Sequence, residues 1–199
     1  MTAYRLRLAV AADAEAICRI YNQGIEDRVA TLETELRTPD DRRQWLASRS
    51  PRHPVIVAET AEFIVAGTVG PALTEGGLRQ TRPGSASADS PSSQGGPIGW
   101  ASLNVFNARE AYRFVADISV YVERGWRGKG VGRVLLEKLT GLGRAHGYHK
   151  LVLSAFPGNA VGMALYTKLG FRTVGIYHEQ GQLDGKWVDT IVMEKLLPV

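Results

Sequence analysis

One segment in the second half of the chain restricts the possible folds more than any other, because it joins an apolar strand, a glycine-rich turn and an amphipathic helix. The strand covers Val115 to Val122, the turn follows at Gly125 to Gly132, and apolar residues then recur at helical spacing. Glycines let a bound group approach the backbone, and the first turn of a helix presents free N–H groups with a partial positive charge. The segment therefore predicts a cradle for a diphosphate group.

The glycine spacing excludes two common phosphate-binding motifs. A P-loop needs a glycine five residues before Gly128, where this chain has Glu123. Gly128, Gly130 and Gly132 are spaced as GxGxG and not as GxGxxG, so the dinucleotide fingerprint is not matched either. What remains is the pattern [RQ]xxGx[GA] over 127–132. Nearby cations are expected to add positive charge: Arg124, Arg127, Lys129 and Arg133. A turn that only joins a strand to a helix is the alternative.

The rest of the chain fits around this segment as a single domain, 1–199. Its 199 residues are 44% apolar, and a chain of this length buries roughly 70% of its surface on folding. Asp13 is expected to cap the first helix. Strands are expected at 4–8, 54–59, 98–106, 115–122, 150–155, 171–177 and 187–195, and helices at about 13–25, 38–49, 131–146 and 160–169. The order β-α-α-β-β-β-α-β-α-β-β predicts the α/β class, with a mixed sheet covered by helices.

Residues 71–97 interrupt this pattern, because Gly, Pro and Ser dominate them. Such a composition cannot bury enough apolar surface to order itself. We expect a flexible insertion within the one domain, with a mobile lid over a site as the alternative. Residues 63–69, just before it, are expected to form a further strand or to extend a hairpin.

The composition also excludes several classes of protein. One cysteine and the lack of any Cys/His cluster argue against disulfides and against a metal site. No apolar run approaches the about 20 residues of a membrane helix, and the first residues resemble no signal peptide. The net charge of +4 is spread without a long basic run, so nucleic-acid binding is not expected. We expect a cytoplasmic protein that is a mildly basic globular domain or one that binds an anionic small molecule.

Two groups of motifs resemble the GNAT superfamily of N-acetyltransferases. Val120-Tyr121-Val122, the turn at 127–132 and the following helix resemble its acetyl-coenzyme A (acetyl-CoA) motif, and Asn159, Tyr166 and Leu169-Gly170-Phe171 resemble its second block. Residues 107–112 and 181–189 are most similar to the phosphinothricin acetyltransferase group. That group acts on phosphinothricin, arsinothricin and methionine sulfone or sulfoximine. The resemblance implies a twisted sheet splayed between its fourth and fifth strands, with acetyl-CoA in the splay, no metal, and a homodimer.

The resemblance also assigns roles to individual residues. Asp117 stands where relatives carry a glutamate, and it is the candidate general base, directly or through a water. Tyr166 is the candidate proton donor to the leaving sulfur. For both, a purely structural role is the alternative. Contacts to acetyl-CoA are implied for Val120, Tyr121, Val122, Arg127, Gly128, Lys129, Gly130, Val131, Gly132, Arg133, Asn159 and Lys168.

The acceptor substrate is expected beside the turn that precedes the central strand, at Arg109, Glu110, Ala111 and Tyr112. An arginine fork suits a carboxylate or phosphinate, although a solvated arginine is the alternative. The function implied is direct acetyl transfer from acetyl-CoA to the amine of a small amino-acid-like substrate, in a ternary complex. Acetylation of a protein or peptide, and a non-catalytic module that binds acyl-CoA, are the alternatives.

Overall fold

The computed structural model of the chain describes residues 3–60 and 96–198. Along these residues the element order is the predicted one. The strands are β1 (Tyr4–Leu8), β2 (Val55–Thr60), β3 (Gly99–Val105), β4 (Val115–Val122), β5 (Lys150–Ala155), β6 (Arg172–Leu183) and β7 (Lys186–Leu196). The helices are α1 (Ala14–Glu26), α2 (Pro39–Ala47), α4 (Val131–Ala145) and α5 (Ala160–Lys168), with short 3₁₀ turns η1 (Ala11–Asp13), η2 (Glu110–Tyr112) and η3 (Arg124–Trp126).

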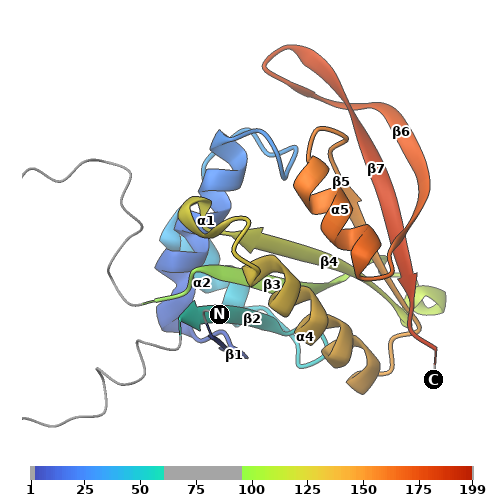
Figure 1. The fold of residues 1–199 in the computed structure, drawn as a ribbon. Helices are drawn as coiled ribbons and strands as arrows, with labels where there is room; N and C mark the ends of the chain where they lie inside the picture. Colours follow the sequence, from blue (N-terminus) through green and yellow to red (C-terminus); the bar gives the residue numbers. More distant parts are fainter. Residues whose placement is uncertain (1–2, 61–95, 199) are drawn as a thin grey trace, which may run out of the picture.

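The strands form one sheet in the order β1-β2-β3-β4-β5-β7-β6, which confirms the mixed α/β sheet (Figure 1). Neighbouring strands are antiparallel except β4 and β5, which are parallel. A parallel pair needs a crossover connection, and α4 supplies it. The β6–β7 hairpin extends beyond the rest of the sheet.

The splay lies between β4 and β5. These strands pair only at Val115–Lys150, Ala116–Leu151 and Asp117–Val152. Beyond Asp117, β4 continues to Val122 while remaining paired with β3 on its other edge. The expected opening between the fourth and fifth strands is therefore present, and it begins at Asp117.

Helices cover both faces of the sheet. On one face, α4 buries Val131, Leu135 and Leu139 against β2, β3 and β4, and α5 packs beside it. On the other face, Ile17 and Ile20 of α1 pack against Trp100 of β3. Residues of α2 pack against the same cluster. Burying these apolar side chains is the main stabilising term of the fold.

The first helix begins where the sequence indicates, but Asp13 does not cap it with its side chain. Its carboxylate accepts hydrogen bonds from Arg7 at 2.7 Å and from the Val10 N–H at 2.8 Å. The nearby cation offers a stronger, charge-assisted bond than the helix N–H groups do. At α2, in contrast, Thr38 and Asp41 form a complete capping box, with Pro39 at the start of the helix.

The last hairpin differs from the prediction. A turn was expected over 180–186, whereas β6 continues to Leu183 and only Asp184 and Gly185 connect the strands, both with positive φ. Asp-Gly is a favoured two-residue hairpin turn. The polar residues before it lie on an exposed edge strand, where polar side chains remain hydrated. The insertion expected at 71–97, apart from Gly96 and Pro97, and the strand expected at 63–69 lie outside the described residues.

Candidate functional site

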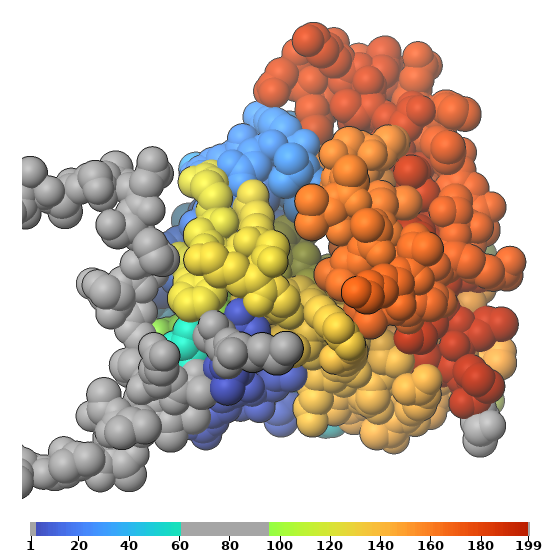
Figure 2. Space-filling view, viewed as in Figure 1, coloured from blue at the N-terminus to red at the C-terminus, as the bar shows by residue number. Residues whose placement is uncertain are grey.

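A cleft of about 250 Å³ opens where β4 and β5 separate. Figure 2 shows the hollow between the α1–α2 segment, the turn before α4, and α5. Its lining comes from the α1–α2 loop, β4, β5, the start and middle of α5, and β7. The lining residues are Val29, Ala30, Thr31, Leu32, Asp117, Ile118, Ser119, Val120, Tyr121, Leu153, Ser154, Ala155, Phe156, Asn159, Tyr166 and Thr190.

The edge of β4 that faces the cleft carries backbone groups without a strand partner. Just after β4, the Glu123 N–H donates toward β3, to the Ile98 carbonyl at 2.9 Å. Successive residues of a strand direct their N–H groups to opposite edges, so Val120 and Val122 face the splay. The Val122 carbonyl accepts from Arg127 Nε at 3.2 Å. The Val120 N–H is therefore aimed at the cleft, ready to bind a carbonyl oxygen.

The turn before α4 is the predicted cradle, and its role in binding stays a prediction. Gly128 and Gly130 have φ angles of +75° and +92°, and a Cβ at either position would meet no atom within 4 Å. Among the described hydrogen bonds, neither glycine N–H donates to a protein acceptor. Val131 and Gly132 begin the helix, so their N–H groups lack intrahelical partners. This open, N–H-rich surface suits a diphosphate.

The cations near the cradle contribute less free charge than expected. Asp27, at the end of α1, pairs with Arg124 at 2.6 Å and with Arg127 at 2.5 Å. Arg133 pairs with Glu137 at 2.8 Å. Their guanidinium groups are thus partly neutralised, and Arg127 stabilises the turn through Asp27 and the Val122 carbonyl. Its contact with acetyl-CoA stays a prediction.

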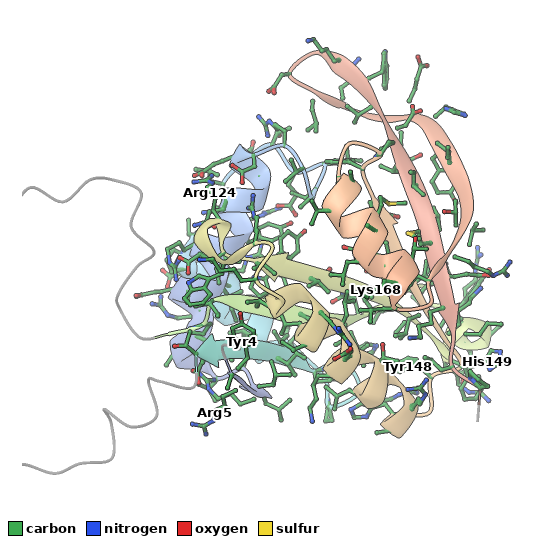
Figure 3. All side chains as sticks on the ribbon, viewed as in Figure 1. Tyr4, Arg5, Arg124, Tyr148, His149 and Lys168 are labelled. Atoms are coloured by element: carbon green, nitrogen blue, oxygen red, sulfur yellow. The ribbon has the colours of Figure 1, made fainter. Side chains whose placement is uncertain are left out.

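Two lysines carry the remaining positive charge beside the cradle. Within residues 3–60 and 96–198, no ion pair involves Lys129 or Lys168. Lys129 lies over the Trp126 ring at 4.9 Å, and its carbonyl accepts a 2.6 Å hydrogen bond from the Tyr4 hydroxyl. In Figure 3, Lys168 lies between α5 and α4, whereas Arg124 lies beside the end of α1. A residue of the first strand thus holds the cradle in place.

Asp117 lies at the point where the strands part. Burial raises the pKa of its carboxyl to about 6, and a hydrogen bond from Asn104 opposes that rise. At neutral pH the carboxyl is mostly ionised, yet its affinity for a proton is much higher than that of a solvated aspartate. These are the properties of a general base.

Tyr166 and Asn159 line the same cleft from α5. Burial raises the pKa of the Tyr166 hydroxyl, which therefore keeps its proton at neutral pH. Asn159 caps α5 by accepting from the Gly162 N–H at 2.9 Å. The structure thus brings Asp117, the β4 edge, Asn159 and Tyr166 together.

The acceptor residues predicted before β4 do not line this cleft. Arg109, Glu110, Ala111 and Tyr112 form the exposed turn around η2, and Glu110 pairs with Arg113 at 2.7 Å. Tyr112 borders a separate hollow of about 110 Å³. No arginine or lysine lines the main cleft within the part of the chain that is described. The acceptor roles of these residues stay predictions.

Comparison with known proteins assigns the family. The family described as "Acetyltransferase (GNAT) family" matches residues 15–171. The chain belongs to the GNAT family of acetyltransferases. It is 30% identical, over 95% of its length and 92% of the relative, to an L-methionine sulfoximine/L-methionine sulfone acetyltransferase of Pseudomonas aeruginosa.

Two solved GNAT-family structures extend this likeness. A phosphinothricin acetyltransferase from Sinorhizobium meliloti in complex with acetyl-CoA has a TM-score of 0.78 and 28% identity, covering 99% of this chain and 89% of that one. A ribosomal-protein-alanine N-acetyltransferase from Brucella melitensis has a TM-score of 0.76 and 30% identity, covering 97% and 99%. Both share the GNAT fold over nearly their whole length.

Several residues of the GNAT cleft were not singled out in the sequence. Thr31 and Leu32 come from the α1–α2 loop, Ser154 from β5 and Thr190 from β7. Ser154 interrupts an otherwise apolar strand, which is a usable signal of a polar cleft face. The others have no local pattern, because tertiary packing alone brings them to the cleft.

No group of three or more metal-binding side chains occurs in the described ranges. None of the described helices is long and apolar enough to cross a membrane. Cys18 is buried in α1, where its thiol donates to the Arg37 carbonyl at 3.0 Å, and it does not line the cleft.

Proposed function

We propose that this GNAT enzyme transfers the acetyl group of acetyl-CoA directly to the amine of a small amino-acid-like substrate. Phosphinothricin, arsinothricin and methionine sulfone or sulfoximine represent the substrate class. The observation that carries the proposal is Asp117, a buried carboxyl of raised pKa at the origin of the splay. The functions of the Pseudomonas and Sinorhizobium relatives support the substrate class.

The residues present fit acetyl-CoA. The open space over Gly128 and Gly130 accepts a diphosphate against free N–H groups, with Lys129 and Lys168 nearby. The unpaired edge of β4 offers hydrogen bonds to an extended amide chain such as pantetheine, much as a neighbouring strand would. When bound, acetyl-CoA supplies a thioester whose acetyl carbon is open to attack by an amine.

Three groups of this chain would serve the transfer. Asp117 takes the proton of the substrate ammonium, directly or through a water, because an ammonium has no lone pair with which to attack. The Val120 N–H binds the carbonyl oxygen as negative charge develops on it. The Tyr166 hydroxyl gives a proton to the sulfur that leaves. No covalent acyl-enzyme is needed, and the position of Cys18 offers no support for one.

The size of the cleft favours a small acceptor, because its volume of about 250 Å³ must hold the reacting end of acetyl-CoA together with the amine. Thr31, Ser154 and Thr190 supply neutral hydrogen-bonding groups. A protein or peptide acceptor is the second candidate, and the function of the Brucella relative favours it. A homodimer, a cytoplasmic location and a role in resistance also belong to this proposal and rest on the resemblance.

Release of free CoA thiol, measured with DTNB, distinguishes these candidates. The purified enzyme is supplied with acetyl-CoA and, separately, with phosphinothricin, methionine sulfone, methionine sulfoximine or an alanine-initiated peptide. We expect kcat/KM at least about tenfold higher for the amino-acid analogues than for the peptide. The reverse order makes the enzyme a peptide acetyltransferase. Binding of acetyl-CoA without thiol release for any acceptor makes it a non-catalytic module.

Arg109→Ala tests the predicted acceptor contact. KM should rise by about tenfold for acceptors that carry an anionic group, with little change in kcat, because the guanidinium binds and moves no proton. Steady-state kinetics with anionic and neutral amines provide the measurement. Arg43→Ala, at an exposed arginine of α2, controls for the change in net charge. Equal losses for both kinds of amine would rule out an anion-binding role for Arg109.

A further inference from the structure

A ladder of polar side chains lies on the face of β3 and β4 that packs toward α1 and α2. Antiparallel register sets Asn104 opposite Asp117 and Ser102 opposite Ser119. Directly opposed residues share one face of the sheet. Ser102 is fully buried, and Asn104 is partly buried and absent from the cleft lining. Asn104 therefore reaches the cleft only through Asp117 and Ser119.

Both the Nδ2 and the Oδ1 atom of the Asn104 amide form hydrogen bonds. Its Nδ2 donates to Asp117 Oδ2 at 3.2 Å and to Ser119 Oγ at 3.0 Å. Its Oδ1 accepts from Ser102 Oγ at 2.9 Å and from Arg49 Nη2 at 3.1 Å. A flipped amide would set its oxygen against the carboxylate and its N–H groups against the guanidinium. The two charges therefore select one orientation of the amide.

Arg49 is itself fixed from several sides. Its Nε donates to the His53 carbonyl at 2.9 Å, and its Nη2 also donates to the Leu103 carbonyl. Its guanidinium lies 5.0 Å from the centre of the Trp45 ring. The end of α2 thus holds the amide of a β3 residue, which in turn holds a carboxylate of β4.

We propose that Asn104, oriented by Arg49, is a positioning residue that holds Asp117 at the origin of the splay and keeps it ionised at neutral pH. The proposal rests on the proposed function, in which Asp117 is the base. By donating to Oδ2, Asn104 leaves Oδ1 for the substrate. The same bond favours the carboxylate over the protonated acid and so offsets part of the cost of burial.

Among the described residues, the groups that line the cleft beside Asp117 do not titrate in the same range. Tyr121 on β4 and Tyr166 on α5 line the cleft, and burial raises the pKa of both hydroxyls, so both stay neutral. The described residues that the α1–α2 loop, β5 and β7 contribute to the lining carry no charge. Behind Asn104 lie the permanent charge of Arg49 and the imidazole of His53, whose pKa burial lowers from its ordinary 6.5. The carbon-13 signal of the Asp117 carboxyl separates its titration from that of His53. A change in the titration of Asp117 therefore reports on the Asn104–Arg49 pair.

Asn104→Leu tests the proposal, because leucine has a similar volume but donates no hydrogen bond. The pKa of Asp117 is measured in the free enzyme by carbon-13 NMR of the side-chain carboxyl, independently of activity. We expect a rise of about one pH unit. The acid limb of kcat/KM should move by the same amount, giving about a fivefold loss near pH 6 and near-normal activity above about pH 8. Thr140→Val, which removes a buried hydroxyl bond in α4, is the control and should shift neither.

A double-mutant cycle with Arg49→Met tests how the arginine acts. If Arg49 acts through the amide, Arg49→Met raises the pKa of Asp117 in the wild-type background and has no further effect beside Asn104→Leu. Additive shifts would mean a direct effect of the charge and would overturn the orienting role of Arg49. An unchanged pKa in Asn104→Leu overturns the proposal even if activity falls. A shifted pKa with an unmoved acid limb instead removes Asp117 as the base, and with it the proposed function.

Discussion

Asp117→Asn is expected to lower kcat and kcat/KM together by about 100-fold or more, the usual scale for loss of a general base. Asparagine has nearly the same shape and retains a carbonyl oxygen that accepts from Asn104. What it loses is the capacity to take a proton from the substrate ammonium. The affinity for acetyl-CoA should be unchanged, because the cradle at Gly128 and Gly130 is built by the turn before α4.

The pH profile provides the second part of this test. In the wild-type enzyme kcat/KM should fall as the pH drops through about 6, where the Asp117 carboxyl becomes protonated. The variant should lack this limb. Its activity should instead rise with pH, because more of the amine is then already neutral in solution. Turnover close to wild type at pH 7 would place the base elsewhere. Glu110, one alternative, is exposed and paired with Arg113.

Loss of folding does not explain the expected result, since the substitution should stabilise the protein. The folded state raises the pKa of Asp117 above its ordinary value of 3.8 to about 6. The part of the burial cost that comes from ionisation is therefore absent well below pH 4, grows between about pH 4 and 6, and reaches ~3 kcal/mol at most above that. Asparagine carries no such cost. A higher thermal midpoint for the variant above about pH 7, with lost turnover, separates catalysis from stability.

The parts of the fold that were predicted correctly are those with a local signal. β4 and β5 match their predicted bounds because both are short apolar runs that end at turn residues. Gly128 and Gly130 permit the left-handed backbone that the turn adopts, so the position of the turn could be predicted from the sequence, while its role as a cradle stays a prediction. Asp117 was singled out through the family resemblance, and its raised pKa follows from burial that only the folded sheet creates.

The parts that were missed depend on contacts between distant residues. The sequence predicts free cations at Arg124 and Arg127, yet both form ion pairs with Asp27, which is 97 and 100 residues away in the chain. No local sequence pattern predicts such an ion pair, because it forms only where the end of α1 lies beside the turn that precedes α4. Asn104 is likewise an ordinary polar residue until the β3–β4 register sets it opposite Asp117. The position of a residue within a helix or strand can be predicted from sequence spacing. Its contact partners in another helix or strand can be identified only from the tertiary fold.

Gly130→Glu is expected to abolish binding of acetyl-CoA while leaving the protein folded. Gly130 precedes α4 with φ +92°, and its missing side chain leaves open space above the free N–H groups. A glutamate there occupies the cradle and sets a carboxylate against the diphosphate. Like charges brought together cost several kcal/mol, which corresponds to a loss of about 100-fold or more in affinity.

The fold should tolerate this change because the new side chain points into space. The left-handed backbone costs a non-glycine residue ~1–2 kcal/mol, and a carboxylate at the start of a helix recovers part of that through the helix dipole. Gly141→Glu is the matched control. It lies on the same helix, is exposed, has no atom within 4 Å of its Cβ position and needs no left-handed backbone.

Calorimetric titration with acetyl-CoA, together with the thermal midpoint of each variant, decides the result. Gly141→Glu should bind as the wild type does, since it adds the same charge to α4 away from the cradle. Gly130→Glu should melt within a few degrees of the wild type and show no heat of binding. Unchanged affinity in a folded Gly130→Glu protein would mean that the diphosphate binds elsewhere. The exposed N–H groups of Gly128 and Gly130, which have no protein acceptor among the described residues, would then be satisfied by water.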